Sequence, residues 1–120
     1  GSGKSTLALA LMALGATLVA DDKVLLSVEH EELIARSPTV LAGLIEARGL
    51  GLLQAEYCQQ SAICAVIDMD STEQDRLPVS LNTEILGQTV TLLRRFDAAH
   101  LAPALLQYLK RGRRDPDAGT

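Results

Sequence analysis

The chain has 120 residues, of which 48% are hydrophobic and 22% charged, and its formal net charge is −4 at pH 7. This length fits one domain of roughly 100 to 150 residues, and the composition excludes a disordered or collagen-like chain. A negative charge and only two tyrosines and one phenylalanine argue against nucleic-acid binding, which uses a basic face or aromatic stacking platforms. We therefore expect a globular domain that does not act on nucleic acid.

Targeting and cysteine patterns point to the cytoplasm. We find no apolar run long enough for a membrane span and no signal-peptide pattern, so we expect a cytoplasmic protein without membrane contact. Cys58 and Cys64 fit neither a disulfide framework nor a zinc site, and we expect both to be reduced and partly buried.

Residues 4–14 consist of strong helix formers that are apolar on nearly every side. Gly15 follows where a helix places its left-handed C-cap, so we predict a buried helix. Residues 16–20 are a short apolar run that ends in Asp21 and Asp22. This pattern predicts a strand whose carboxyl end carries two acids.

Hairpins and loops are predicted for the middle of the chain. Residues 23–28 and 33–35 predict a hairpin around a polar stretch, and residues 39–44 a short apolar turn. Gly49 and Gly51 then flank Leu50, which predicts a loop that holds Glu46 and Arg48 and is followed by a strand.

Residues 61–69 are apolar and β-branched and predict the central strand, followed by a charged loop over residues 70–76. Residues 84–86 and 89–93 predict a second hairpin, joined by Gly87 and Gln88. A last helix is predicted from Asp97 or Ala98 to Arg111. The polar residues 112–120 are expected to be a disordered tail.

The opening GSGKST segment matches the second half of the Walker A motif, G-x-x-x-x-G-K-[ST]. Its small residues let the backbone wrap a phosphate whose charge faces the positive end of the next helix. Lys4 would reach the β and γ phosphates, and the Ser5 hydroxyl would bind magnesium. Because the chain opens inside the motif and without Met, we expect a fragment that lacks its first strand.

Two further sets of residues fit phosphoryl transfer, which needs carboxylates for magnesium and for the nucleophile. Asp21 and Asp22 are expected at the same sheet edge as the phosphate loop; the alternative is that they cap a turn. Glu46 could hold magnesium beside Arg48 and two glycines; the alternative is a surface ion pair between Glu46 and Arg48.

Together, GSGKS, VADD and GLIEARGLGLL resemble the catalytic domain of bacterial HPr kinase/phosphorylase. The resemblance runs from Gly1 to about Arg95 and is greatest to the short alphaproteobacterial form, which lacks a separate N-terminal domain. It implies that ATP, or in some members pyrophosphate, phosphorylates a serine of HPr, the phosphocarrier of the sugar phosphotransferase system. It also implies Mg²⁺ as cofactor, a homo-hexamer, a role in regulating carbohydrate metabolism, and reversal of the reaction by phosphorolysis.

The family pattern assigns roles to the residues that match it. The nucleotide-binding residues are Gly1, Ser2, Gly3, Lys4, Ser5 and Thr6. Lys4 would act on the transferred phosphate, and Ser5 and Glu46 would bind magnesium.

The remaining roles follow from the same resemblance. Asp22 would accept the proton of the substrate serine, with Asp21 as a supporting acid, and Arg76 would assist transfer. The signature segment over residues 45–54 also contains Arg48, Gly49 and Gly51. Residues 91–97 lack the family's segment for dephosphorylation, so kinase activity is the direction expected.

The expected fold is an α/β P-loop kinase-like domain over residues 1–111, with a mixed sheet, hairpins and a C-terminal helix. Two other functions remain open. A small-molecule P-loop kinase would need an arginine-rich lid, whereas residues 70–80 hold one arginine. A non-catalytic module that senses a nucleotide is the third hypothesis.

Overall fold

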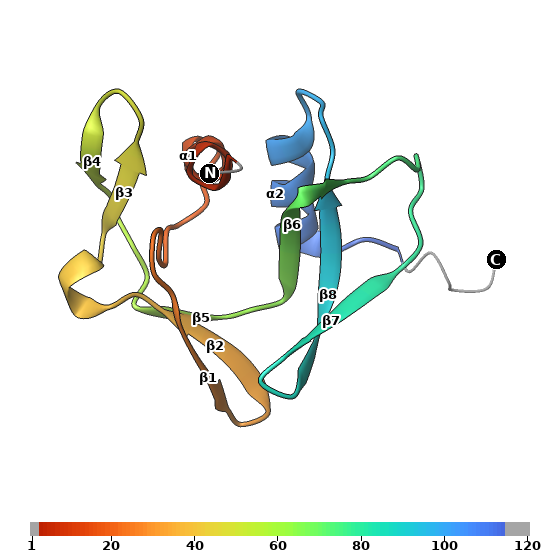
Figure 1. The fold of residues 1–120 in the computed structure, drawn as a ribbon, viewed down its shortest axis with the longest axis horizontal. Coiled ribbons are helices and arrows are strands. Elements are labelled where there is room, and N and C mark those ends of the chain that lie inside the picture. Colours follow the sequence, from red (N-terminus) through yellow and green to blue (C-terminus); the bar gives the residue numbers. More distant parts are fainter. Residues whose placement is uncertain (1–2, 115–120) are drawn as a thin grey trace.

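The computed structural model describes residues 3–114. Helices α1 (Lys4–Ala13) and α2 (Leu101–Arg111) lie near opposite ends of the described chain, and a short 3-10 helix covers Thr39–Leu41. The strands make up three small sheets, ordered β1-β2-β5, β3-β4 and β6-β8-β7 (Figure 1). The strand bounds are β1 Leu25–Glu29, β2 Glu32–Arg36, β3 Leu44–Ala47, β4 Gly51–Gln54, β5 Gln60–Ala62, β6 Ala65–Thr72, β7 Leu81–Ile85 and β8 Gln88–Arg95.

Helix α1 ends as the sequence predicts. Gly15 has a φ of +111°, and the backbone N–H of Ala16 donates to the carbonyl of Leu11 over 3.0 Å. The N–H of Gly15 donates to the carbonyl of Met12, also over 3.0 Å. These two bonds form a Schellman motif, which needs a residue with positive φ at the position of Gly15.

The prediction that α1 is buried is wrong. Within residues 3–114, none of its residues is fully buried. The helix lies between the β3-β4 hairpin and α2 and packs against both (Figure 1). Its apolar residues face all directions, while these neighbours cover only part of its circumference.

The predicted strand over residues 16–20 is not formed. Leu18 makes one isolated parallel bridge to Tyr57, in which the N–H of Cys58 donates to the Leu18 carbonyl over 2.8 Å. Leu18 itself is buried. The apolar run therefore reflects burial of an extended segment without a ladder of strand hydrogen bonds.

The first predicted hairpin is confirmed. β1 and β2 pair antiparallel, with Glu29 opposite Glu32, so that His30 and Glu31 form the turn. Their φ angles are +52° and +66°, as a type I′ turn requires. β1 begins at Leu25, two residues later than predicted, and β5 pairs with the other edge of β2.

A side-chain network crosses this hairpin. Arg36 forms an ion pair with Glu29 over 2.6 Å and donates a hydrogen bond to the Ser27 hydroxyl over 2.9 Å. The Ser27 hydroxyl in turn donates to Glu29 over 3.0 Å. Hydrogen bonds from Arg36 and then Ser27 hold the pKa of Glu29 below its ordinary value of 4.5.

Replacing Glu29 by Gln is expected to lower the free energy of unfolding at pH 7 and to flatten its acid dependence. Because folding lowers the pKa of Glu29, its contribution is present above pH 4.5 and is lost as pH falls through the lower folded pKa. Urea unfolding of both proteins from pH 7 to pH 3 measures this difference. An exposed glutamate outside the network, Glu56→Gln, serves as control; equal pH profiles for Glu29→Gln and the unaltered protein would contradict the assignment.

Glu46 lies on a strand, whereas the sequence predicts a loop. β3 and β4 form an antiparallel hairpin in which Ala47 pairs with Gly51, so the loop is limited to residues 48–50. The φ angles of Gly49 and Gly51 are +98° and +112°, values that favour glycine. The predicted strand after the glycines is confirmed as β4, and its partner β3 was not predicted.

The prediction of one central strand over residues 61–69 is wrong, although residues 65–69 do belong to a strand, β6. The segment is split, because β5 joins the first sheet and β6 joins the third. Ile63, which lies between β5 and β6, donates its N–H to the carbonyl of Leu33 over 2.8 Å and so continues the pairing of β5 with β2. β8 occupies the centre of the third sheet, parallel to β6 and antiparallel to β7. Residues 70–72, predicted as loop, belong to β6.

The second hairpin is confirmed with a shifted turn. β7 and β8 are joined by Leu86 and Gly87, one residue earlier than predicted, and their φ angles are +50° and +79°. The last helix ends at Arg111 as predicted but begins at Leu101, because residues 98–100 form a turn in which the N–H of Leu101 donates to the carbonyl of Ala98 over 3.1 Å. Of the predicted disordered tail, residues 115–120 lie outside the described part of the chain.

The core is small and comes from several elements. Its buried apolar residues are Leu18, Leu33, Ile34, Ala35, Ile45, Ala47, Met69, Val90, Ala102 and Leu105.

Cys58 and Cys64 are free thiols, as expected, but both are exposed, which corrects the expectation of partial burial. With 10 and 11 residues, α1 and α2 are both too short to cross a lipid bilayer.

Gly43 is a position where a side chain does not fit. Its φ is +73°, and an added Cβ would lie 2.8 Å from Cδ1 of Tyr57 and 3.1 Å from the carbonyl oxygen of Ala55. Gly43→Ala is therefore expected to lower the free energy of unfolding by about 3 kcal/mol, from backbone strain plus steric overlap. Gly87→Ala, with a similar φ and no atom within 4 Å, should cost about 1 kcal/mol by strain alone. Denaturant unfolding of both variants measures the difference, and equal losses would contradict the steric part.

Candidate active site

A cavity of about 460 Å³ lies where the start of α1, the segment after it and the end of β3 meet. This volume is in the range of small-molecule sites. The cavity is lined by Gly3, Lys4, Ser5, Thr6, Leu9, Asp21, Asp22, Glu46, Ala47 and Arg48. The structure thus brings together three segments that are distant in sequence: the start of α1, residues 21–22 and residues 46–48.

The start of α1 is built to face an anion. Gly3 has a φ of +89° and precedes the first helical residue, Lys4. Within residues 3–114, α1 has neither a side-chain cap nor an acidic residue in its first turn. The free N–H groups and the positive end of the helix dipole are therefore available to a phosphate.

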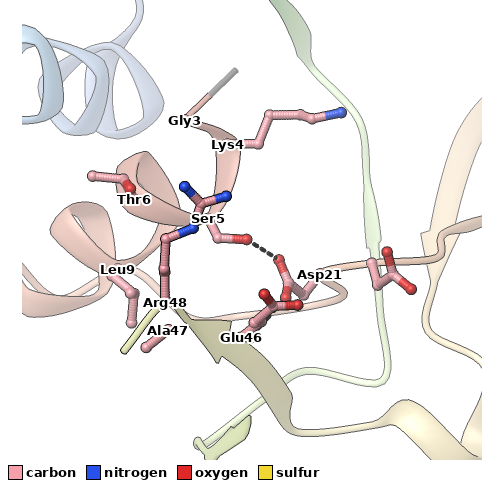
Figure 2. A pocket seen from close by; sticks show the side chains of 10 residues that line it. Gly3, Lys4, Ser5, Thr6, Leu9, Asp21, Glu46, Ala47 and Arg48 are labelled. Carbon is pink, nitrogen blue, oxygen red and sulfur yellow. Dashed lines mark hydrogen bonds between the residues drawn. The ribbon is translucent and has the colours of Figure 1, made fainter. Parts of the chain in front are cut away.

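Asp21 links this helix start to β3. Its Oδ1 accepts a hydrogen bond from the Ser5 hydroxyl over 2.8 Å, and its Oδ2 accepts one from the backbone N–H of Glu46 over 2.9 Å (Figure 2). Each carboxylate oxygen therefore holds a different segment. This connection fixes the position of Ser5 relative to β3.

Charges of both signs surround the cavity. Figure 2 shows Arg48 directed from the end of β3 toward the start of α1, while Lys4 points away from the Asp21 carboxylate. The lining holds two basic side chains, Lys4 and Arg48, and three carboxylates, Asp21, Asp22 and Glu46, which gives a formal charge of 2 − 3 = −1. A polyphosphate would meet net repulsion here unless a cation accompanies it.

The donor atoms fit Mg²⁺. Mg²⁺ prefers oxygen ligands and commonly takes one or two carboxylates, with phosphate and water supplying the rest. The Ser5 hydroxyl and the carboxylates of Asp22 and Glu46 line one cavity and offer oxygen atoms that could hold such an ion. Within residues 3–114, no group of three or more His, Cys, Asp or Glu side chains is arranged to hold a metal ion.

Of the other residues expected at the site, Arg76 and two glycines lie elsewhere. Arg76 lies in the loop between β6 and β7 and is not among the described residues that line the cavity. Gly49 and Gly51 shape the β3-β4 turn without lining the cavity. Gly1 and Ser2, both expected to bind nucleotide, lie outside the described residues.

The sequence did not indicate three parts of the site. Leu9 lines the cavity because it lies one helical turn after Ser5, a spacing that could have revealed it. Met69 of β6 lies beneath Gly3, where its Cε is 4.0 Å from the position of an added Cβ. The N–H of Glu46 has no signal in the sequence, because every residue except proline carries one.

Comparison with known proteins identifies the family. The model of the HPr Serine kinase C-terminal domain matches residues 1–92. The chain belongs to this family. The HPr kinase/phosphorylase of Clostridium beijerinckii is 45% identical over 105 residues, covering 78% of this chain and 35% of that protein. That of Lactobacillus delbrueckii subsp. bulgaricus is 34% identical over 104 residues, covering 76% and 33%.

A solved structure supports the fold of this HPr serine kinase C-terminal domain. The HPr(Ser) kinase/phosphatase from Coxiella burnetii matches with a TM-score of 0.75 and 27% identity, covering 90% of this chain and 74% of that one. This confirms the α/β fold with a mixed sheet and a C-terminal helix. The chain spans about a third of the length of the two relatives named above.

Proposed function

We propose that this domain is the P-loop core of a cytoplasmic serine kinase that transfers the γ-phosphoryl group of ATP to HPr. The observation that carries the proposal is the convergence of Ser5, Asp21, Asp22 and Glu46 in one cavity at the start of α1. The chain belongs to a family whose members named above are HPr kinase/phosphorylases. The chemistry of the lining agrees with phosphoryl transfer, which needs positioning and charge neutralisation.

In the proposed reaction, Asp22 accepts the proton of the HPr serine hydroxyl as the serine oxygen attacks the γ-phosphorus. The bond from the γ-phosphorus to the β,γ-bridging oxygen breaks, and ADP leaves. The N–H groups of the first turn of α1 and the Lys4 ammonium hold the phosphates. Bound Mg²⁺, held by Ser5 and Glu46, would neutralise phosphate charge.

Asp21 has a supporting role in this proposal. It does not need to touch the phosphate, because its two oxygens hold Ser5 and the backbone of Glu46. It thereby sets the separation between the two residues proposed to bind magnesium. Such positioning contributes to catalysis because small misplacements of reacting groups lower the rate steeply.

The test is transfer of label from γ-³²P-ATP with Mg²⁺ to purified HPr by the full-length protein. We expect label on a serine of HPr and none on HPr in which that serine is replaced by alanine. Incubating the labelled HPr with inorganic phosphate and looking for pyrophosphate tests the reverse reaction, and sedimentation tests the proposed hexamer.

Other outcomes would favour the other hypotheses. ATP binding without transfer to HPr would support a nucleotide-sensing module. Transfer of label to a small molecule in a metabolite extract, with HPr unlabelled, would support a small-molecule kinase.

A further inference from the structure

A second cavity lies between α2 and one face of the sheet β6-β8-β7, and among residues 3–114 it shares no lining residue with the candidate active site. Its volume is about 150 Å³. One water molecule occupies about 30 Å³ in the liquid, so a cavity of this size has room for a small ligand. Apolar side chains form most of its wall: Val79, Leu81, Leu92, Phe96, Leu105 and Tyr108.

The sheet wall of this cavity is a continuous apolar surface. Leu81 and Leu92 are directly paired across β7 and β8, so their side chains lie on one face of the sheet. α2 covers this face with Leu105 and Tyr108, which are one helical turn apart. An apolar cavity of about 150 Å³ accommodates one benzene-sized ring.

Two arginines mark the charged side of the cavity. Arg94 on β8 and Arg113 after α2 both line it, and both are exposed. Within residues 3–114, neither forms an ion pair within 4 Å. A guanidinium group binds a carboxylate through two parallel hydrogen bonds, so these arginines are suited to an anionic group at the cavity mouth.

The nearby acids are already engaged locally. Glu73 also lines the cavity, and its Oε2 accepts hydrogen bonds from the N–H groups of Gln74 and Asp75, both over 3.1 Å. Asp68 lies opposite Arg94 in the strand register, but its oxygens accept from the Asp70 N–H and the Ser71 hydroxyl, both over 2.9 Å. Because these acids already accept hydrogen bonds from other groups, the guanidinium groups of Arg94 and Arg113 are available to a ligand carboxylate.

We propose that this cavity binds a small aromatic carboxylate, with its ring between α2 and the β7-β8 hairpin and its carboxylate on Arg94 and Arg113. The site is independent of the proposed kinase function, because it is assembled from different residues. Two features together define its ligand: a six-membered ring that contacts the apolar wall of the cavity, and one negative charge at the mouth of the cavity.

Benzoate is the probe for this proposal, titrated into the full-length protein by isothermal calorimetry and followed by ligand-observed NMR. Benzamide offers the same ring without charge, and acetate offers the charge without the ring. We expect benzoate to bind at least tenfold more tightly than either. Absence of benzoate binding, or equal binding of benzamide, would overturn the proposal.

Two variants with the same change of charge locate the site. Arg94→Gln is expected to weaken benzoate binding at least tenfold while leaving benzamide binding unchanged. Arg111→Gln changes an exposed arginine on α2 that does not line the cavity, and benzoate binding should remain as it was. An equal loss in both variants, or no loss in Arg94→Gln, would contradict the assignment.

A third variant tests the apolar part of the site. Ala104 lines the cavity, and Ala104→Leu adds three carbon atoms that would occupy the space of the ring. We expect loss of benzoate binding without a lower melting temperature, because the added side chain fills a void. Retained benzoate binding in a folded Ala104→Leu protein would place the ligand elsewhere.

Discussion

Replacing Asp22 by Asn is expected to lower phosphoryl transfer to HPr by about 10²- to 10⁴-fold, the usual contribution of a general base. Asparagine has nearly the same shape, but its amide cannot accept the serine proton. ATP should still bind, because the helix start and Lys4 are unchanged. The measurement is the single-turnover rate of transfer, together with ATP affinity by equilibrium binding.

The matched control for Asp22 is Asp75→Asn. Asp75 is an exposed acid that does not line the cavity, so its replacement changes the net charge equally and should leave the transfer rate intact. Undiminished transfer by Asp22→Asn would exclude Asp22 as the base. Equal loss in both variants would point to net charge as the cause.

Replacing Asp21 by Asn is expected to lower kcat/KM for transfer by about 10²-fold through misplacement of Ser5 and Glu46. The structural reason is the sharing of its two oxygens, which accept from the Ser5 hydroxyl and the Glu46 N–H. An asparagine has one accepting oxygen, so its NH₂ group must face one of these donors. One of the two segments therefore loses its attachment.

Hydrogen exchange separates this positioning role from a general loss of stability. The amide of Glu46 should exchange faster in Asp21→Ala, which removes both accepting oxygens, while amides of the distant hairpin β7-β8 keep their rates. Asp22→Ala serves as control, because in the structure it is Asp21 that accepts from the Glu46 amide. Unchanged exchange of the Glu46 amide in Asp21→Ala would show that Asp21 does not hold β3.

Local rules predict well where neighbouring residues decide the structure. The extent of α1, its glycine C-cap and both hairpins follow from nearby residues, and these predictions are confirmed. Residues 3–6 of the phosphate-loop motif were also expected near Asp21, Asp22 and Glu46, and the structure brings these residues and Arg48 to one cavity. Their chemical roles stay predictions.

Long-range pairing is where the sequence is insufficient. The apolar run over residues 61–69 has the composition of one buried strand, yet it supplies strands to two different sheets. An apolar run also predicts a strand at residues 16–20, where Leu18 has one bridge partner. In both cases hydrophobicity reports burial, whereas strand formation depends on partners that are distant in sequence.

The three sheets share no strand, and this has a consequence for how the molecule unfolds. A ladder of hydrogen bonds that opens in one sheet does not have to propagate into the next, so each sheet can open as its own cooperative unit. The β3-β4 pair, which carries Glu46, is the smallest of these units and depends for its support on α1 and on Asp21. Opening of this pair would then displace Glu46 from the proposed magnesium site before global denaturation, and a bound nucleotide would stabilise the pair as well as serve as a substrate.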